Sequence, residues 1–148
     1  MESNESIQTS GHIYVAILKA CAMLKDLERG IQIHSKIDQL GLLRNDIYVG
    51  SALVDMYGKS GLLFEAQEIF NKLSIRNVVS WTALLVGYFE HGCSEEALYC
   101  FEEMQHQGIS PNFIAYICSL KACASVGSKM KGRLVHVEII ERGFEEEL

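Results

Sequence analysis

A five-residue sequence near the start of the chain recurs near its end. Leu18–Ala22 (LKACA) is repeated as Leu120–Ala124, which lies 102 residues further along. Three more residues recur in the same register: Gly30, His34 and Gly41 as Gly132, His136 and Gly143. A long-range repeat of this kind constrains the chain to a linear array of similar units, each of which contacts only its neighbours.

The stretch between the two copies shows what one unit contains. Residues 81–88 carry apolar side chains at positions i, i+3, i+4 and i+7, which form one face of a helix. Gly92 is expected to end this helix, Ser94 can cap a second helix, and Pro111 ends that one. Two short antiparallel helices cannot bury both apolar stripes alone, so each unit needs neighbours of its own kind.

The 102-residue spacing divides into units of 36, 31 and 35 residues, and a fourth unit then repeats the first. We therefore predict an all-α fold, an α-solenoid of helix-turn-helix repeats with about eight helices in a right-handed superhelix. The predicted segments are a disordered leader or remnant of a preceding unit at 1–10, and units at 11–46, 47–77, 78–112 and 113–148. Outside the third unit, the expected helices are 13–22, 27–40, 47–58, 62–73, 113–125 and 130–141. Position twenty of every unit is small, which predicts close helix approach there: Gly30, Ala66, Ala97 and Gly132.

Composition argues against several classes of protein. The net charge of −6 argues against charge-driven binding to nucleic acid, and the third unit has five acidic residues and no Lys or Arg. No apolar run approaches the ~20 residues of a membrane span, so we expect no membrane association. Residues 1–5 are acidic, and no targeting peptide is visible. The five cysteines lack paired spacing, which indicates reduced thiols, and Cys21 and Cys123 are expected to be small buried residues.

The alternation of 36, 31 and 35 residues, with LKACA, SALVDMYGKSG and VVSWTALLVGYFEHGC, resembles the plant pentatricopeptide repeat family. It resembles the subclass that rotates long, short and standard repeats, and the resemblance covers Gly11–Leu148. It implies an RNA-binding protein of the mitochondrion or chloroplast that acts in C-to-U editing, splicing or transcript maturation. The implied partners are single-stranded RNA and other RNA-processing proteins, with no small-molecule substrate.

The resemblance also implies which residues recognise RNA bases. In this family the fifth and the last residue of a repeat together recognise one base, which here gives Ser51 with Asn77 and Thr82 with Asn112. A hydroxyl and an amide can each donate and accept hydrogen bonds, so together they can match the Watson–Crick edge of a base. The resemblance implies that such pairs prefer adenine. The alternative is that all four residues are ordinary helix or turn surface.

Three further side chains complete the implied RNA site. Tyr48 and Val79, the second residues of their units, would flank the bases, since base stacking contributes ~1–3 kcal/mol per base. Lys59 matches a lysine that family members set near the RNA backbone. Val15 and Ile117 stand at the recognition position of the two long units and cannot hydrogen-bond a base, so we expect these units to recognise none.

Two other function classes remain open at the level of sequence. The first is a protein-binding helical scaffold like the tetratricopeptide family, although those repeats keep a steady 34-residue period. The second is a truncated product with little activity. His136-Val137-Glu138 matches the start of the zinc deaminase signature, but no P-C-x-x-C follows it and the repeat of His34 explains His136. We therefore predict no metal, no cofactor and no catalysis.

Overall fold

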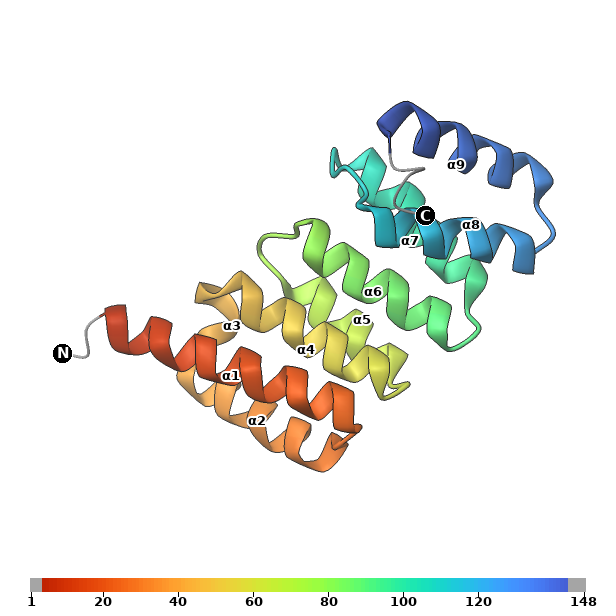
Figure 1. Ribbon diagram of the computed structural model, residues 1–148. Helices are drawn as coiled ribbons and strands as arrows, with labels where there is room; N and C mark the ends of the chain where they lie inside the picture. Colours follow the sequence, from red (N-terminus) through yellow and green to blue (C-terminus); the bar gives the residue numbers. More distant parts are fainter. Residues whose placement is uncertain (1–3, 144–148) are drawn as a thin grey trace.

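The computed structural model describes residues 4–143, and for residues 4–10 it describes the backbone alone. Residues 1–3 of the predicted leader and residues 144–148 at the end of the fourth unit lie outside the described residues. The described part contains nine helices and no strand (Figure 1), which confirms the all-α prediction. The helices are α1 (Asn4–Leu24), α2 (Leu27–Leu40), α3 (Leu42–Asn45), α4 (Ile47–Lys59), α5 (Leu63–Lys72), α6 (Val78–Glu90), α7 (Ser94–His106), α8 (Phe113–Ser125) and α9 (Lys129–Arg142).

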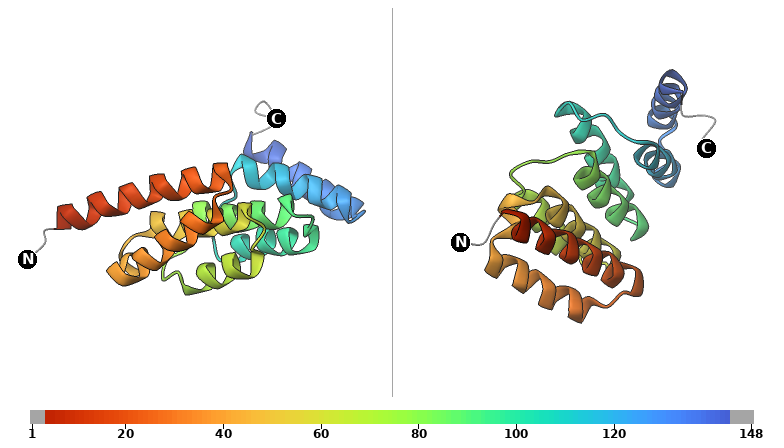
Figure 2. Two further views of the ribbon diagram at one scale, coloured as in Figure 1. Left: turned by 90° about the horizontal axis from the view of Figure 1, so that it is seen from below. Right: turned by 60° about the vertical axis from the view of Figure 1, so that its left-hand side comes forward.

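Successive helices pair into hairpins that stack in two layers. The hairpins are α1–α2, α4–α5, α6–α7 and α8–α9. The first layer contains α1, α4, α6 and α8, which contact one another in that order, and the second layer contains α2, α5, α7 and α9. The additional views in Figure 2 show the same stepwise stacking, with α1 and α9 at opposite ends of the molecule.

The last residue of each of the first three predicted units is the N-cap of the next helix in the first layer. Asp46 Oδ1 accepts hydrogen bonds from the amides of Tyr48 and Val49 at the start of α4. Asn77 caps α6, where its side chain and that of Ser80 form a reciprocal capping box. Asn112 caps α8 through one hydrogen bond, which its Oδ1 accepts from the Ala115 amide. These Asx side chains satisfy amides that have no partner within the helix, which fixes where each hairpin begins.

An edge-to-face contact between two aromatic rings spans each seam between successive units. His34 of the first unit contacts Tyr57 of the second, with ring centroids 5.5 Å apart. The corresponding distances at the next two seams are 4.6 Å for Phe70–Trp81 and 5.5 Å for Phe101–Tyr116. Such pairs contribute about 0.5–1.5 kcal/mol beyond their buried area, so each seam has a specific contact in addition to aliphatic packing.

Two glycines let α4 and α6 approach each other closely. A Cβ placed on Gly87 would lie 3.1 Å from the Cα of Gly58, and a Cβ on Gly58 would lie 3.3 Å from the Cα of Gly87. Both neighbouring atoms are backbone, so neither can move aside as a side chain could. The absence of side chains here lets α4 and α6 pack closely near their C-terminal ends.

The structure adds two details to the predicted architecture. Residues 4–10 continue α1, so the expectation of a disordered leader is wrong for them; the segment holds no Gly or Pro that would stop a helix. The linker Gly41–Asp46 contains the extra one-turn helix α3, which makes nine helices instead of about eight. Buried Leu42 anchors that turn.

The expected close approach at position twenty holds unevenly. Gly30 lies against Met56, and both Ala66 and Ala97 are buried. At Gly132 the packing is looser, because a Cβ placed there would meet only Cys123, at 3.7 Å. Within the described residues, no helix is both long enough and apolar enough to cross a membrane.

Candidate functional site

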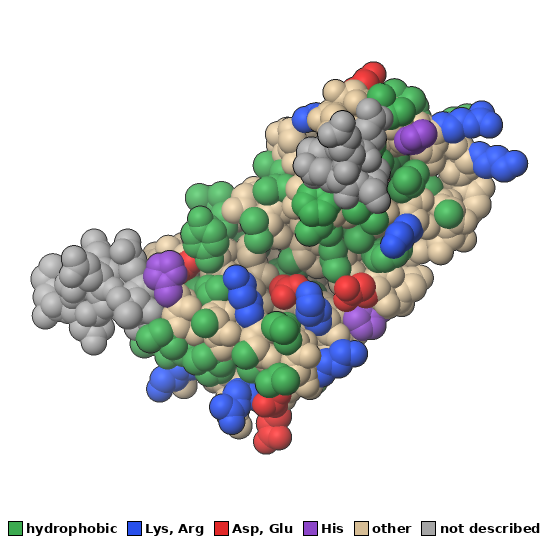
Figure 3. Space-filling model, in the orientation of Figure 1, with side chains coloured by type: hydrophobic (Ala, Val, Ile, Leu, Met, Phe, Trp, Pro, Cys, Tyr) green, Lys and Arg blue, Asp and Glu red, His purple; other side chains and the backbone are tan. Residues whose placement is uncertain are grey.

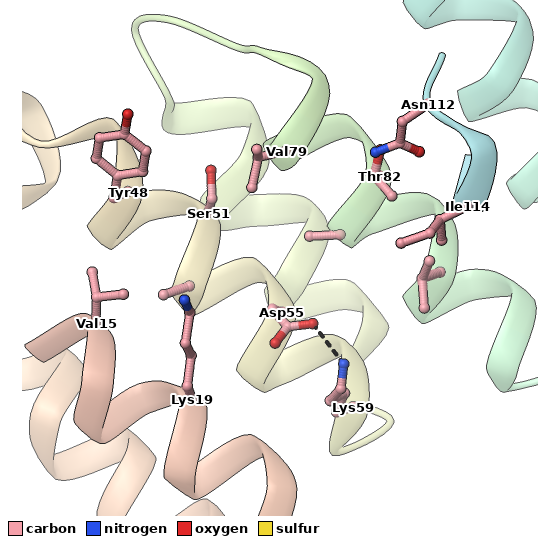
Figure 4. Close-up of a pocket in the computed structure, with 13 residues that line it drawn as sticks. Val15, Lys19, Tyr48, Ser51, Asp55, Lys59, Val79, Thr82, Asn112 and Ile114 are labelled. Atoms are coloured by element: carbon pink, nitrogen blue, oxygen red, sulfur yellow. Dashed lines mark hydrogen bonds and ion pairs between the residues drawn. The ribbon is translucent and has the colours of Figure 1, made fainter.

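A groove of about 380 Å³ runs across the first layer, over α1, α4, α6 and the start of α8. Figure 3 shows this face of the molecule, where hydrophobic side chains spread over the first-layer helices and a few acidic and basic side chains lie among them. The groove is lined by Val15, Lys19, Tyr48, Ser51, Ala52, Asp55, Lys59, Val79, Thr82, Ala83, Val86, Asn112 and Ile114 (Figure 4). It therefore brings together six of the seven site residues predicted from sequence, all but Asn77.

The two predicted hydroxyl residues lie in the wall of the groove. Ser51 and Thr82 are 5% and 8% exposed, so they are more deeply set than the sequence indicated. Neither Ser51 Oγ nor Thr82 Oγ1 has a hydrogen-bond partner among the described residues. A buried hydroxyl without a partner costs about 1–3 kcal/mol, so both positions would be stabilised by a ligand that supplies the missing hydrogen bond.

The two predicted asparagines are placed differently. Asn112 lines the groove, and its Oδ1 accepts a hydrogen bond from the Ala115 amide at 2.9 Å. Because that oxygen caps α8, the amide group of Asn112 is left with N–H donors to offer. Asn77 is not among the groove-lining residues, and its Oδ1 accepts from the amides of Val79 and Ser80 at 3.0 Å each. The structure thus brings Thr82 and Asn112 together in the groove but not Ser51 and Asn77.

The predicted flanking residues project beside the hydroxyls. Tyr48 stands three residues before Ser51 on α4 and is 61% exposed. Val79 holds the same place before Thr82 on α6 and is 49% exposed. Large apolar side chains that stay exposed on a groove wall are suited to stacking against a flat ring. The recurrence of one arrangement on two successive helices gives the groove two similar positions for planar groups.

Three charged residues lie in the groove. The predicted Lys59 forms an ion pair with Asp55, with Nζ and Oδ1 2.9 Å apart. Lys19, which extends from α1 in the direction of Ser51 (Figure 4), forms no ion pair within the part of the chain that the structure describes. The charge that remains unpaired in the groove is therefore that of Lys19.

Sequence reasoning missed Lys19 and Asp55, although a signal for both was present. Lys19 follows Val15 by four residues, and Asp55 follows Ser51 by four residues. Side chains at i and i+4 lie on the same helical face, so each recognition position has a neighbour one turn further along. Ile114 is different, because it enters the groove from the following unit.

The remaining chemistry-bearing residues indicate no second site. All five cysteines are free thiols, and Cys21 and Cys123 are buried at 3% and 1% exposure, which confirms their interpretation as core residues. Burial, with a contribution from Glu96, raises the pKa of the Cys100 thiol to about 12, so it is protonated near neutral pH. Among the described residues, no group of three or more His, Cys, Asp or Glu side chains could hold a metal ion.

Comparison with known families gives two overlapping matches. A model described as "PPR repeat family" matches residues 76–125, and one described as "PPR repeat" matches residues 51–78. Together they cover residues 51–125, which include every groove-lining residue from Ser51 to Ile114 but not Tyr48, Lys19 or Val15.

Similar proteins are found in Arabidopsis thaliana. The pentatricopeptide repeat-containing protein At4g38010 is 39% identical over 133 residues, which is 90% of this chain and 24% of that protein. The pentatricopeptide repeat-containing protein At4g18520, chloroplastic, is 35% identical over 130 residues, 88% of this chain and 21% of that protein. The chain thus spans no more than about a quarter of the length of these relatives.

Solved structures of similar fold are also repeat proteins. The pentatricopeptide repeat protein PPR10 in complex with an 18-nt psaJ RNA element matches with a TM-score of 0.76 and 22% identity, over 95% of this chain and 22% of that one. PPR10 from maize matches with a TM-score of 0.71 and 24% identity, over 88% of this chain and 19% of that one. At these identities the similarity establishes the solenoid fold.

Proposed function

The chain belongs to the pentatricopeptide repeat family, and we propose that its groove binds single-stranded RNA, with one base at Ser51 and the next at Thr82. The role is one of binding, without catalysis. In the longer proteins of this kind the same groove would serve RNA editing or processing in an organelle. The relative named chloroplastic supports the organellar assignment, and the RNA-bound PPR10 structure supports the ligand.

One observation carries the proposal, namely the unpartnered hydroxyls of Ser51 and Thr82. They stand at the same position of two successive units, on neighbouring helices of one layer. A ligand that satisfies both must present polar edges in a row, at the spacing of adjacent helices. Single-stranded RNA has this form, since it carries one polar base edge per nucleotide and its bases can be splayed apart.

The surroundings of Thr82 favour adenine. Asn112 offers N–H donors because its oxygen caps α8, and the Thr82 hydroxyl can accept. Adenine presents the complementary pair, an N1 acceptor beside an N6 amino donor. Val79 and Ile114 line the groove beside this position and supply apolar surface for the base. At Ser51, Tyr48 supplies a ring for stacking, and Asn77 would need to turn from its cap to take part.

The affinity of two such positions is low. Stacking contributes ~1–3 kcal/mol per base, so two bases predict a dissociation constant near 1 mM. The test is a titration of the isotope-labelled chain with six-nucleotide oligoadenylate, oligouridylate and oligocytidylate, followed by NMR chemical shifts. We expect oligoadenylate to bind most tightly and to shift the amides of α4 and α6. Binding without base preference, or shifts confined to the second layer, would contradict the proposal.

Two variants and a matched control sharpen this test. Ser51→Ala and Thr82→Val each remove a buried, unpartnered hydroxyl, so they should stabilise the unbound chain by about 1 kcal/mol while weakening RNA binding. Ser119 Oγ on α8 is also buried and unpartnered but lies outside the groove. Ser119→Ala should therefore give the same gain in stability with unchanged RNA affinity. If RNA affinity falls in all three variants, the loss comes from a change in the fold and not from the missing groove hydroxyls.

A further inference from the structure

The groove holds two lysines with different electrostatic surroundings. Lys59 Nζ lies 2.9 Å from Asp55 Oδ1 on the same helix, so its charge is already compensated. Lys19 belongs to α1 and is exposed, and among the described side chains of residues 11–143 no acidic group pairs with it. Both lysines line the groove on which Ser51 opens. For an anionic group that enters the groove, the uncompensated positive charge is therefore the ammonium group of Lys19.

Lys19 reaches this position from a unit that has no base-recognising side chain of its own. The recognition position of the first unit is Val15, which also lines the groove but has no hydrogen-bonding group. Lys19 lies one helical turn further along the same face of α1, and its side chain extends across the seam towards α4 (Figure 4). The first unit can thus contribute to a nucleotide that the second unit holds.

We propose that Lys19 is the phosphate-binding residue for the nucleotide held at Ser51, and that Lys59 instead orders Asp55. This inference rests on the proposed function. An ammonium group is a compact charge on a flexible stem with three N–H donors, which suits a phosphate whose position varies slightly. The flexible stem lets Lys19 reach a backbone phosphate at the groove rim while the base occupies the apolar floor.

The internal repeat supplies a matched control. Lys121 is the counterpart of Lys19 in the second copy of the LKACA sequence, and it is likewise exposed on a first-layer helix. It does not line the groove, because the described residues place no further first-layer helix beyond α8. Lys19→Gln and Lys121→Gln therefore make the same chemical change and the same change in net charge, but only one of them alters the groove.

The experiment measures binding of the full chain to six-nucleotide oligoadenylate at several salt concentrations. For single strands, the slope of log K against log salt concentration changes by about 0.7 for each phosphate contact. We expect Lys19→Gln to weaken binding and to reduce the magnitude of this slope by about 0.7. Lys121→Gln should leave the slope unchanged, Lys59→Gln should change it less than Lys19→Gln, and Lys19→Arg should retain it.

The possible outcomes separate the two proposals. Equal slopes for Lys19→Gln and Lys121→Gln, with the wild-type chain binding oligoadenylate, would overturn the role of Lys19 alone. A change of base preference in Lys19→Gln at unchanged slope would also overturn it, since that result indicates contact with a base. A wild-type chain that binds no oligonucleotide would overturn the proposed function and this inference together.

Discussion

The thioether of Met56 on α4 lies directly over the backbone of Gly30 on α2, where the first and second units meet. A Cβ placed on Gly30 would lie 2.6 Å from Met56 Sδ and 2.8 Å from its Cε, closer than real Cβ contacts. Met56 is completely buried, so its side chain has little room to move. Gly132, the repeat counterpart of Gly30, has only the Cβ of Cys123 near it, at 3.7 Å.

This difference predicts opposite effects for one substitution at two equivalent positions. Gly132→Ala should stabilise the chain by about 0.5–1 kcal/mol, because alanine loses less backbone entropy in a helix than glycine. Gly30→Ala gains the same term but overpacks the seam, which costs typically 1–3 kcal/mol, so it should be neutral or destabilising. Urea denaturation of both variants measures the difference. Equal midpoints would show that Met56 moves aside without cost.

A second prediction concerns the turns between the two helices of each unit. In each of the four turns, a backbone amide donates a hydrogen bond to the carbonyl of the residue five positions earlier. Examples are Asp26 N to Cys21 O at 2.9 Å and Cys93 N to Tyr88 O at 2.9 Å. The residue before each donor has a left-handed backbone. It is glycine in three units, whereas in the first unit it is Lys25, with φ 54°.

Exchanging these residue types should change stability in both directions. Lys25→Gly should stabilise the chain by about 1 kcal/mol, since a left-handed conformation costs an L-residue about 1–2 kcal/mol. Gly92→Lys, at φ 77° and with no atom within 4 Å of the new Cβ, should destabilise by a similar amount for the same reason. Thermal unfolding of both variants is the measurement. A Lys25→Gly chain no more stable than the wild type would contradict the account.

The contrast between these turns illustrates what sequence could and could not predict. Local signals placed the bounds of α2 and α8 correctly, because Gly41 and Asn112 end or cap a helix through their own backbone and side-chain chemistry. The helix α3 was missed because a single turn has no detectable period. The groove wall was only partly predicted, since Lys19 on α1 lines the groove only because α4, a helix of the next unit, packs beside α1.

The seam between the first two units should weaken as the pH falls. His34 Nδ1 lies 2.7 Å from Tyr57 Oη, and its Nε2 lies 3.5 Å from Asp38 Oδ2. Burial lowers the pKa of His34 below its ordinary value of 6.5; Asp38 opposes this shift, and Lys72 adds to it. A folded-state pKa below the unfolded value means that the stabilisation is fully present above pH 6.5. It is lost as the pH falls from there through the folded-state pKa.

The measurement is the free energy of unfolding of the wild type and His34→Gln between pH 7.5 and 5. We expect the wild type to lose more stability over this interval than the variant, because only the wild type carries an imidazole that binds a proton more readily in the unfolded chain than in its half-buried folded position. His136→Gln makes the same change in the other copy of the repeat, on an exposed side chain. It serves as the matched control for loss of an imidazole. Parallel curves for wild type and His34→Gln would exclude this role of His34.

The final prediction concerns base choice at the Thr82–Asn112 position. Asn112→Asp preserves the N-cap of α8, since Asp and Asn cap helices about equally well, so the fold should be unaffected. It replaces the N–H donors of the amide with a carboxylate that only accepts. Adenine then loses the donor to its N1, whereas guanine, with N1–H and N2–H, gains an acceptor. One hydrogen bond of about 1 kcal/mol corresponds to about a fivefold change in relative affinity from adenine towards guanine.

Six-nucleotide RNAs that carry AA, AG, GA or GG between uridines distinguish the two positions of the groove, and NMR titration gives their relative affinities. The shift towards guanine should occur at one of the two nucleotides and leave the other, held at Ser51, with its original preference. Thr82→Val should reduce the preference at the same nucleotide, because valine keeps the shape of threonine without the hydroxyl. If both variants leave base preference untouched, Thr82 and Asn112 do not recognise the base, and their hydroxyl and amide serve the helix ends and groove wall alone.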